Sequence, residues 1–209
     1  MRGSTPTKVA RLLVHLIKQP EYFFPYLRTN IFSRTSALDL ELPWIAYAAI
    51  DFLDAYLRPQ MSVFEYGSGG STLFFARHCA SVISIEDNAF WLERVRQKLA
   101  DENINNVRLQ HRAFDFKAVT DFEHSEYLNS IPNQKFDLIL VDGSEESVQV
   151  RPTCFAHAEN FVRPGGIIVV DDSWRYTQLR HTHHAKCCRI FQSVGPCRPG
   201  VTSTDVFFY

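Results

Sequence analysis

The stretch SVFEYGSGGSTLFFA, from Ser62 to Ala76, places a run of small residues between two apolar runs. The pattern predicts a strand over 62–66 and a helix over 71–79, with a sharp turn between them. Glycines let the backbone turn tightly and leave its N–H groups open to a ligand, because no side chain occupies that space. We therefore interpret 67–70 as a ligand-binding turn, with an ordinary tight turn as the alternative.

The same alternation of strand and helix continues after this unit. The segment 136–142 is apolar at nearly every position, which is typical of a central parallel strand buried on both faces. Repeated strand–helix–strand units predict a parallel sheet with helices on both faces. The further strands predicted are 81–86, 107–111 and 165–172, and the further helices are 88–102 and 147–162, the last expected to begin only at Pro152.

The two ends of the chain differ from this alternating region. Residues 1–60 contain helical patterns broken by prolines, and we expect them to form a helical extension. A helix is predicted between Pro43 and Pro59. Residues 61–209 form the main domain, which ends in two β-segments that add an antiparallel pair. The apolar run in RLLVHLIK, 11–18, is too short to span a membrane; it predicts a helix packed on the domain, with contact to a membrane surface as the alternative.

Composition sets limits on partners and location. The 209 residues are 45% hydrophobic, which is sufficient for one domain with a substantial core. The net charge is -1, from 22 basic and 23 acidic residues, so no global field favours nucleic acid, and we expect no nucleic-acid partner. Five cysteines form no CxxC pair, and we expect reduced thiols in a cytoplasmic protein.

Acidic residues stand directly after most of the predicted strands. In an open parallel sheet the ligand lies beyond the carboxyl ends of the strands, where the strand order reverses. The junctions expected to form the site are 65–72, 86–87, 113–115, 142–144 and 171–174. The turn lacks a complete G-x-G-x-x-G fingerprint, because Thr72 stands at the third glycine position. Glu65, two residues before Gly67, is a better neighbour for a cationic ligand than for a pyrophosphate.

In order along the chain, FEYGSGGST, VISIED, FDLILVDG, VRPGGIIVVDD and STDVFFY resemble the motifs of class I S-adenosylmethionine-dependent methyltransferases. The resemblance covers roughly residues 60 to 209, and it is closest to uncharacterised bacterial small-molecule methyltransferases. It implies a doubly wound, mostly parallel seven-stranded Rossmann-like sheet with an antiparallel C-terminal strand. It also implies S-adenosylmethionine as the cofactor.

The resemblance also assigns cofactor-binding residues. It places the turn beside the methionine and ribose portions and Glu65 near the cofactor's amino group. Glu86 is expected to hold the ribose, because a carboxylate can accept hydrogen bonds from two hydroxyls; the alternative is a cap for the next helix, which Asn88 could provide. Asp115 is a further, weakly supported neighbour of the adenine. The full predicted cofactor set is Glu65, Gly67, Ser68, Gly69, Ser71, Thr72, Glu86, Asp87, Phe114 and Asp142.

Asp142 and Asp171 are the predicted catalytic residues. Asp142 could orient the acceptor, contact the cofactor's amino group or accept a proton. Together with Asp172 they match the acidic pattern of metal-dependent O-methyltransferases, so Asp142, Asp171 and Asp172 are a candidate Mg²⁺ site. The alternative is that these aspartates cap the following helix and bond to backbone. The histidine that such enzymes often carry after the fourth strand is absent.

Two further groups of residues remain open at this point. Arg151 and Arg175 are candidates for holding an anionic substrate group, with rim salt bridges as the alternative. The segment RHTHHAKCC, 180–188, contains metal-ligand residue types but lacks the paired spacing of a zinc site, and a polar connection is the favoured interpretation.

These observations predict methyl transfer from S-adenosylmethionine to a hydroxyl group of a small-molecule acceptor. We expect no stable membrane insertion and keep a homodimer as a possible assembly. One alternative is an NAD-dependent oxidoreductase, although the incomplete glycine fingerprint and the absence of Y-x-x-x-K weigh against it. The other is a non-catalytic relative that binds the cofactor without turnover.

Overall fold

A computed structural model describes residues 5–32, 35–117, 120–144 and 146–209. One mixed sheet of seven strands forms its centre, in the order β3-β2-β1-β4-β5-β7-β6. None of the helices in the described ranges has the length and apolar character that a membrane span requires. The strands are β1 (Ser62–Tyr66), β2 (Ser81–Glu86), β3 (Val107–His111), β4 (Phe136–Val141), β5 (Val162–Val170), β6 (Cys187–Gly195) and β7 (Arg198–Phe208).

The sheet confirms the predicted fold class. The pairs from β3 through β5 are parallel, and β7 pairs antiparallel with both β5 and β6. The strand order reverses between β1 and β4, so the carboxyl ends of these two strands frame the expected ligand crevice. The described helices are α1 (Thr5–Lys18), η1 (Pro20–Tyr22), α2 (Phe23–Leu27), η2 (Arg28–Phe32), α3 (Tyr47–Tyr56), α4 (Gly70–His78), α5 (Ala89–Asp101), η3 (Phe122–His124), η4 (Leu128–Ser130), α6 (Val150–Ala158), η5 (Ser173–Arg175) and η6 (Thr177–His181).

The predicted strands at 62–66, 81–86 and 107–111 have the bounds of β1, β2 and β3, whereas the other predicted strands and helices differ from the structure at one or both ends. The fifth strand begins at Val162 and ends at Val170, because Asp172 adopts a left-handed backbone conformation (φ 49°) that turns the chain away. α6 begins at Val150 rather than Pro152, which is tolerated since N–H groups in a first turn have no helical partner. α3 starts only at Tyr47, four residues after Pro43.

The two faces of the sheet bury different side chains. Along β1, Val63 belongs to the core that α3 and α4 cover, while Phe64 and Tyr66 belong to the core that α6 covers. This alternation follows from the two-residue period of a strand. Glu65 alternates with them and is fully buried on the side of α4. A carboxylate in that position needs hydrogen-bond partners, and the start of α4 supplies them, as described below.

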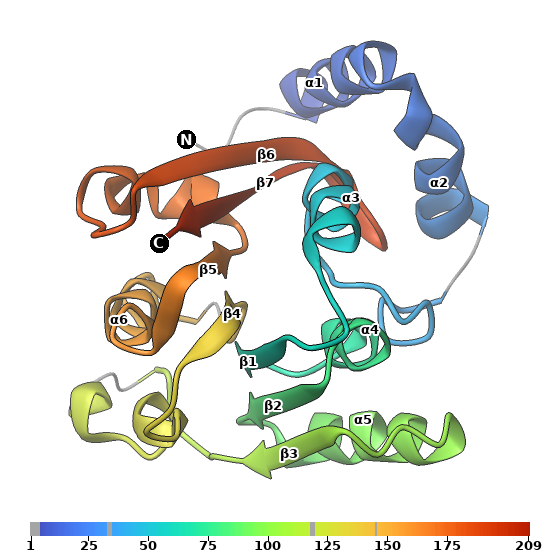
Figure 1. Ribbon diagram of the computed structural model, residues 1–209. Coiled ribbons are helices and arrows are strands. Elements are labelled where there is room, and N and C mark those ends of the chain that lie inside the picture. The colour runs from blue at the N-terminus through green and yellow to red at the C-terminus, as the bar shows by residue number, and fades with distance from the viewer. Residues whose placement is uncertain (1–4, 33–34, 118–119, 145) are drawn as a thin grey trace.

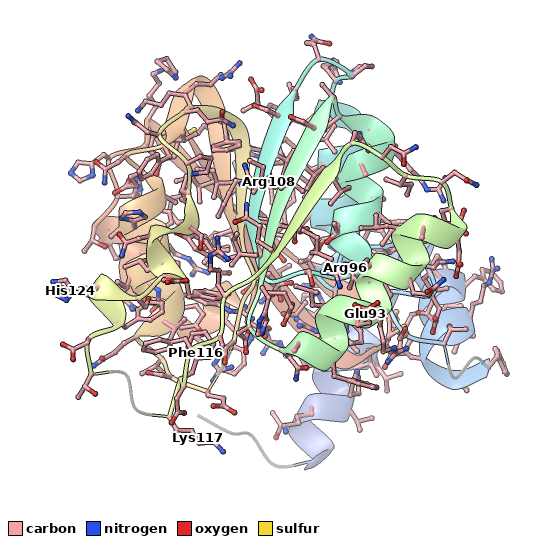
Figure 2. All side chains as sticks on the ribbon, turned by 90° about the horizontal axis from the view of Figure 1, so that it is seen from below. Glu93, Arg96, Arg108, Phe116, Lys117 and His124 are labelled. Carbon is pink, nitrogen blue, oxygen red and sulfur yellow. The ribbon has the colours of Figure 1, made fainter. Side chains whose placement is uncertain are left out.

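The N-terminal helices pack at the antiparallel end of the sheet. α1 contacts β6 and β7, and α3 contacts β6. Figure 1 shows α1 and α2, in blue, outside the long red strands and far from β3. At the opposite end, α5 buries Leu92, Val95 and Leu99, while Glu93 and Arg96 lie on its outer side in Figure 2.

Two glycines mark where the chain from 37 to 45 passes tightly against the sheet domain. A Cβ atom at Gly70 would lie 2.2 Å from the carbonyl oxygen of Leu42 and 2.3 Å from that of Ala37. At Gly195 it would lie 2.5 Å from the carbonyl oxygen of Ile45. A Cβ atom in a real protein essentially never lies this close to a non-bonded atom. Backbone atoms also cannot move aside as the end of a flexible side chain can. This part of the N-terminal region is therefore built into the body of the protein.

We expect Gly70→Ala to destabilise the protein by about 3 kcal/mol, because the added methyl group forces the backbone of 37–42 away from α4. Gly69→Ala is the matched control, since its Cβ would meet only Trp91, at 3.9 Å, and we expect a change below about 1 kcal/mol. Urea unfolding of both variants measures the difference. Equal stability of the two variants would show that the contact with 37–42 is not rigid.

Candidate functional site

A cavity of about 610 Å³ opens at the carboxyl ends of β1 and β4. Its walls come from the turn after β1, from the end of β2, from 142–144 after β4, and from the N-terminal segment 35–38. The lining is completed by Trp44, Trp91, Arg151, Cys197 and Arg198. The volume lies within the range of about 300–1,000 Å³ that is typical of small-molecule sites. The cavity thus lies at the position that the strand order predicts for a ligand.

The glycines of the turn serve different purposes. Gly67 has φ +90°, and a Cβ there would lie 2.7 Å from the carbonyl oxygen of Asp142. The neighbour that excludes a side chain at position 67 is therefore the protein's own backbone, which corrects the expectation that a ligand alone needs this space. Gly69 lines the cavity, and its Cβ would meet only Trp91. Space for a ligand is therefore an explanation that applies to Gly69.

Glu86 lies at the cavity wall and ties the turn to β2. One carboxylate oxygen accepts hydrogen bonds from the backbone N–H (3.0 Å) and the hydroxyl (2.8 Å) of Ser68, and the other accepts from the N–H of Asn88 (2.9 Å). Asn88, as the sequence suggested, caps α5 by accepting from the N–H of Trp91. Glu86 is therefore not needed as a helix cap. A carboxylate can accept about four hydrogen bonds, so it retains capacity toward a ligand.

A second carboxylate follows immediately. Asp87 also lines the cavity, and burial together with the neighbouring Glu86 raises its pKa to about 6. Trp91 donates its indole N–H to the carbonyl oxygen of Ser68 (2.8 Å), which fixes the ring beside the turn. This wall therefore offers two acidic groups, backbone and an aromatic ring, a combination suited to a ligand with hydroxyl groups, positive charge and a flat ring.

Glu65 lies beneath the turn and is not among the residues that line the cavity. One of its oxygens accepts from the hydroxyl of Ser71 (2.8 Å) and the other from the hydroxyl of Thr72. Thr72 in turn accepts from the N–H of Gly69 (3.0 Å). Burial raises the pKa of Glu65 to about 7, against the opposing effect of these hydroxyls. In this structure Glu65 and Thr72 hold the turn in shape from below.

The remaining predicted cofactor residues divide into two groups. Ser68 and Ser71 line the cavity. Phe114 does not; its ring packs against Phe116 and Phe122 in the core that α6 covers. Asp115 is exposed and accepts from the N–H of Lys117. The structure therefore supplies no contact between the cavity and Phe114 or Asp115.

Asp142 follows β4 and faces the cavity. Its carboxylate forms an ion pair with Arg151 at 3.1 Å, and its side chain retains 18% exposure. Burial raises the pKa of Asp142 well above its ordinary value, while Arg151 acts in the opposite direction. Arg151 also donates to the carbonyl oxygens of Gly143 (2.8 Å) and Asp171 (2.9 Å). It therefore braces the ends of β4 and β5. Because Arg151 also lines the cavity, its contact with a substrate anion stays a prediction.

Asp171 and Asp172 bond to the returning strand β7. Asp171 is fully buried and accepts from Thr204 (2.8 Å) and Arg198 (3.1 Å). Asp172 accepts from Arg198 (2.9 Å) and Thr202 (2.8 Å). Neither aspartate is among the cavity-lining residues. Asp171 therefore acts through Arg198, which does line the cavity. The alternative of a helix cap and a bond to backbone differs from the structure, because Asp172 precedes η5 without a side-chain cap bond and the contacts given above are to arginine and threonine side chains.

These contacts disagree with the predicted Mg²⁺ site. A divalent ion needs several carboxylate or carbonyl oxygens converging on one point. Instead, two guanidinium groups lie among Asp142, Asp171 and Asp172. Within the ranges that the structure describes, no group of three or more His, Cys, Asp or Glu side chains is arranged to hold a metal ion. The sequence places the three acids at neighbouring strand ends but cannot show that arginines from elsewhere neutralise them.

The same result applies to the histidine- and cysteine-containing segment. His184 bonds to Glu159, His183 packs against Phe207, and Cys187 is exposed on β6. This favours the interpretation of 180–188 as a connection into the sixth strand. Arg175 lies over the rings of Trp174 and Tyr176 and does not line the cavity.

Sequence reasoning missed several contributors to the cavity, namely residues 35–38, Trp44, Trp91, Cys197 and Arg198. Trp44 is 50% exposed, and the guanidinium of Arg198 lies 5.0 Å from the centre of its ring. Cys197, beside Arg198, accepts the indole N–H of Trp44 at its carbonyl oxygen (3.2 Å). The one sequence signal that could have pointed to Trp44 was its position next to the helix-breaking Pro43. The sequence predicted two joined C-terminal β-segments, but it did not show that the turn between β6 and β7 brings Cys197 and Arg198 to the cavity.

Comparison with known proteins identifies a family model that covers more than half of the chain. Residues 64–173 match the family model described as a methyltransferase domain. This range begins in β1 and ends just after β5, so it includes the glycine turn, Glu86 and Asp142. No curated protein sequence matches the chain.

Solved structures share the fold at low sequence identity. The O-methyltransferase TomG of tomaymycin synthesis from Streptomyces achromogenes, solved with SAM, is 18% identical, with a TM-score of 0.61 over 96% of this chain and 98% of its own. Cofactor-bound Rv0187 from MTB is 20% identical, with a TM-score of 0.58 over 100% and 98%. An rRNA methylase from Streptococcus thermophilus is 15% identical, with a TM-score of 0.54 over 76% and 92%.

The buried carboxyl group of Glu65 predicts a pH effect on stability. Its folded pKa, about 7, lies above the ordinary value of 4.5, so the folded state retains a proton that the unfolded chain has lost. Stability from this group is therefore complete below about pH 4.5 and falls by about 3 kcal/mol as the pH rises to about 7.

Glu65→Gln removes this titration while keeping a polar amide near Ser71 and Thr72. We expect the unfolding free energy of the wild type, minus that of the variant, to decrease between pH 5 and pH 8. Urea unfolding at a series of pH values measures this difference. A difference independent of pH would mean that Glu65 is ionised in the folded protein throughout.

Proposed function

Because the chain belongs to the methyltransferase-domain family, and is a class I S-adenosylmethionine-dependent methyltransferase, we propose that it methylates a hydroxyl group on a small-molecule acceptor. When bound, the cofactor supplies a methyl group on a positively charged sulfur atom. The protein has to position the acceptor in line with that group, exclude water and remove the hydroxyl proton. The family identification replaces the NAD-dependent and non-catalytic alternatives.

The wall formed by β1 and β2 fits the cofactor. Glu86 has remaining acceptor capacity for ribose hydroxyls, and Gly69 leaves the backbone of the turn open to the cavity. Asp87 and Trp91 lie where an adenosine group bound to Glu86 would extend. Gly67, Ser68 and Ser71 form the turn, while Glu65 and Thr72 support it. These residues would hold the cofactor; Phe114 is left out of this set because it lies away from the cavity.

The adjoining wall, at the end of β4, would hold the acceptor. Asp142 lies there with a side chain that reaches the cavity, and Trp44 and Arg198 line the same cavity. Asp142 would accept the proton from the acceptor's hydroxyl group. The oxygen of that hydroxyl group would take the methyl group from the cofactor's sulfur atom. A base works best with a pKa near the working pH, and burial raises the pKa of Asp142 in that direction.

The single observation that carries the hydroxyl assignment is this partly exposed carboxylate with a raised pKa facing the cavity. Two of the structurally similar proteins are named for different reactions: one is an O-methyltransferase of tomaymycin synthesis and the other an rRNA methylase. The net charge of -1 favours a small molecule over a nucleic acid. The half-exposed ring of Trp44 gives a flat surface on which an acceptor ring can stack.

We do not assign Mg²⁺ to this reaction, because Arg151 and Arg198 form ion pairs with the three aspartates that would have held it. Asp171 is assigned as a positioning residue for Arg198 rather than as a catalytic residue. Residues 1–60 are proposed as an extension and 61–209 as the domain that binds the cofactor, in a cytoplasmic enzyme. The part of the extension that reaches the cavity is 35–38 and Trp44.

We expect Asp142→Asn to lower the rate of methyl transfer by about 10²- to 10⁴-fold, because the amide cannot accept the proton. The measurement is release of S-adenosylhomocysteine with a panel of small hydroxyl, amine and thiol acceptors, after exhaustive chelation of divalent metals. Cofactor affinity, measured by calorimetry, serves as the control and is expected to stay within about threefold. Turnover of amines alone, or loss of turnover on chelation, would overturn the proposal.

We expect Glu86→Gln to weaken binding of S-adenosylhomocysteine about tenfold or more, since a charged acceptor for the ribose hydroxyls is lost. Thermal shift and calorimetry of the wild type and the variant measure this effect. NAD serves as the comparison ligand, and we expect it to give no stabilisation. Unchanged affinity in the variant, with its fold intact by circular dichroism, would show that Glu86 points away from the ribose.

A further inference from the structure

The outer surface of the N-terminal helices carries large apolar side chains in contact with water. Ile17 is 77% exposed, Phe24 76% and Phe32 79%. Single exposed apolar residues are ordinary on protein surfaces, but a group of them on successive short elements indicates an interaction surface. We call this surface the N-terminal apolar face, formed by Val9, Leu13, Ile17, Phe24, Ile31 and Phe32.

α1 is apolar on more than the side that packs on the protein. Leu12 and Leu16 face the core shared with β6 and β7. Val9, Leu13 and Ile17 are four residues apart and so form a separate stripe along the helix, and each is at least half exposed. The core therefore accounts for the inner leucines but leaves the outer stripe without a partner among the described residues.

The N-terminal segment has an excess of basic over acidic residues, unlike the rest of the chain. Residues 1–34 contain six Lys and Arg residues and one acidic residue, Glu21. The rest of the chain contains 16 basic and 22 acidic residues. On α1, Lys8, Arg11 and Lys18 occupy the side of the helix that carries no apolar residue, and all three are exposed. Apolar side chains bordered by Lys and Arg are typical of helices that lie in a membrane interface.

We infer that the N-terminal apolar face docks on an anionic lipid surface, with its helices lying in the plane of the interface rather than crossing it. The exposed Ile and Phe side chains would enter the headgroup region, and the basic residues would pair with lipid phosphates and carboxylates. A second copy of the chain fits less well. In a twofold dimer the same patch faces itself, which would bring two strongly basic segments together.

This surface lies close to the cavity along the chain. Phe32 ends η2, and Thr35, three residues later, lines the cavity. Figure 1 shows α1 and α2 on the outside of the molecule, so a flat surface can approach them without touching β3 or α5. Docking would therefore bring the cavity near the lipid. The inference goes beyond methyl transfer, and its test does not require an acceptor.

The experiment measures sedimentation of the full chain with vesicles. One set is phosphatidylcholine alone, and the other contains about 30% phosphatidylserine. We expect binding to the anionic vesicles, at least about tenfold stronger than to the neutral ones, and weakened when salt is raised from about 0.1 M to about 0.5 M. Absence of binding to the anionic vesicles would overturn the inference.

Matched variants locate the surface. We expect Phe24→Ser with Phe32→Ser to weaken binding at least about tenfold. Phe90→Ser with Val148→Ser is the control, because Phe90 is 76% exposed and Val148 61% exposed on other elements. Since all four side chains are exposed, we expect both variants to fold, which circular dichroism checks. Equal vesicle binding by the two variants would overturn the inference.

A second pair of variants tests the charge. Lys8→Gln, Arg11→Gln and Lys18→Gln together are expected to weaken binding about tenfold or more. The control combines Arg96→Gln, Arg108→Gln and Lys117→Gln, which remove the same charge from three exposed residues on α5, on β3 and in the segment after β3. Figure 1 shows α5 and β3 at the end of the molecule opposite α1. If both triple variants weakened vesicle binding equally, only net charge would matter, and the inference that this face docks on lipid would be overturned. Light scattering tests the alternative that this face binds a second copy of the chain. That alternative would be supported if the protein is a dimer, does not bind vesicles, and becomes a monomer when Phe24 and Phe32 are substituted.

Discussion

The close approach of β1 and β4 at their carboxyl ends is the constraint on which the site depends. Position 67 carries no side chain, so the carbonyl oxygen of Asp142 comes to a place where a Cβ atom would be only 2.7 Å away. The glycine turn and the end of β4 consequently form adjoining walls of one cavity. The next residue, Gly143, is also closely packed, since a Cβ there would collide with the hydroxyl group of Tyr127. Backbone packing at the strand switch point, more than side-chain chemistry, fixes where the ligand can lie.

A second constraint is the neutralisation of buried charge. Three aspartates follow β4 and β5, and isolated carboxylates at such depth would be strongly unfavourable. Arg151 comes from α6 and Arg198 from β7, so the negative charges are balanced by residues from two different elements. This balance leaves Asp142 facing the cavity with one ion-pair partner and removes Asp171 and Asp172 from direct contact with a ligand. The sequence places acidic residues at this edge of the sheet, and in the folded protein they form ion pairs with arginines.

The N-terminal region combines two roles within 60 residues. Its segment 37–45 passes so tightly against Gly70 and Gly195 that the cavity could not keep its shape without it. Its preceding helices bury Leu16, Tyr22 and Tyr26 but leave another set of apolar residues exposed. One part of the region therefore completes the site, while the other faces outward with a basic border.

The sequence by itself determined the order of strands and helices, the antiparallel C-terminal pair and the glycine turn, because these follow from patterns within a few neighbouring residues. It also placed Glu86 and Asp142 at strand ends. Only the tertiary structure decided that Glu65 lies beneath the turn and that Phe114 packs against the core. It also decided that arginines form ion pairs with the three aspartates. Those outcomes depend on contacts between residues far apart in the chain, such as Arg198 with Asp171, and no local pattern encodes them.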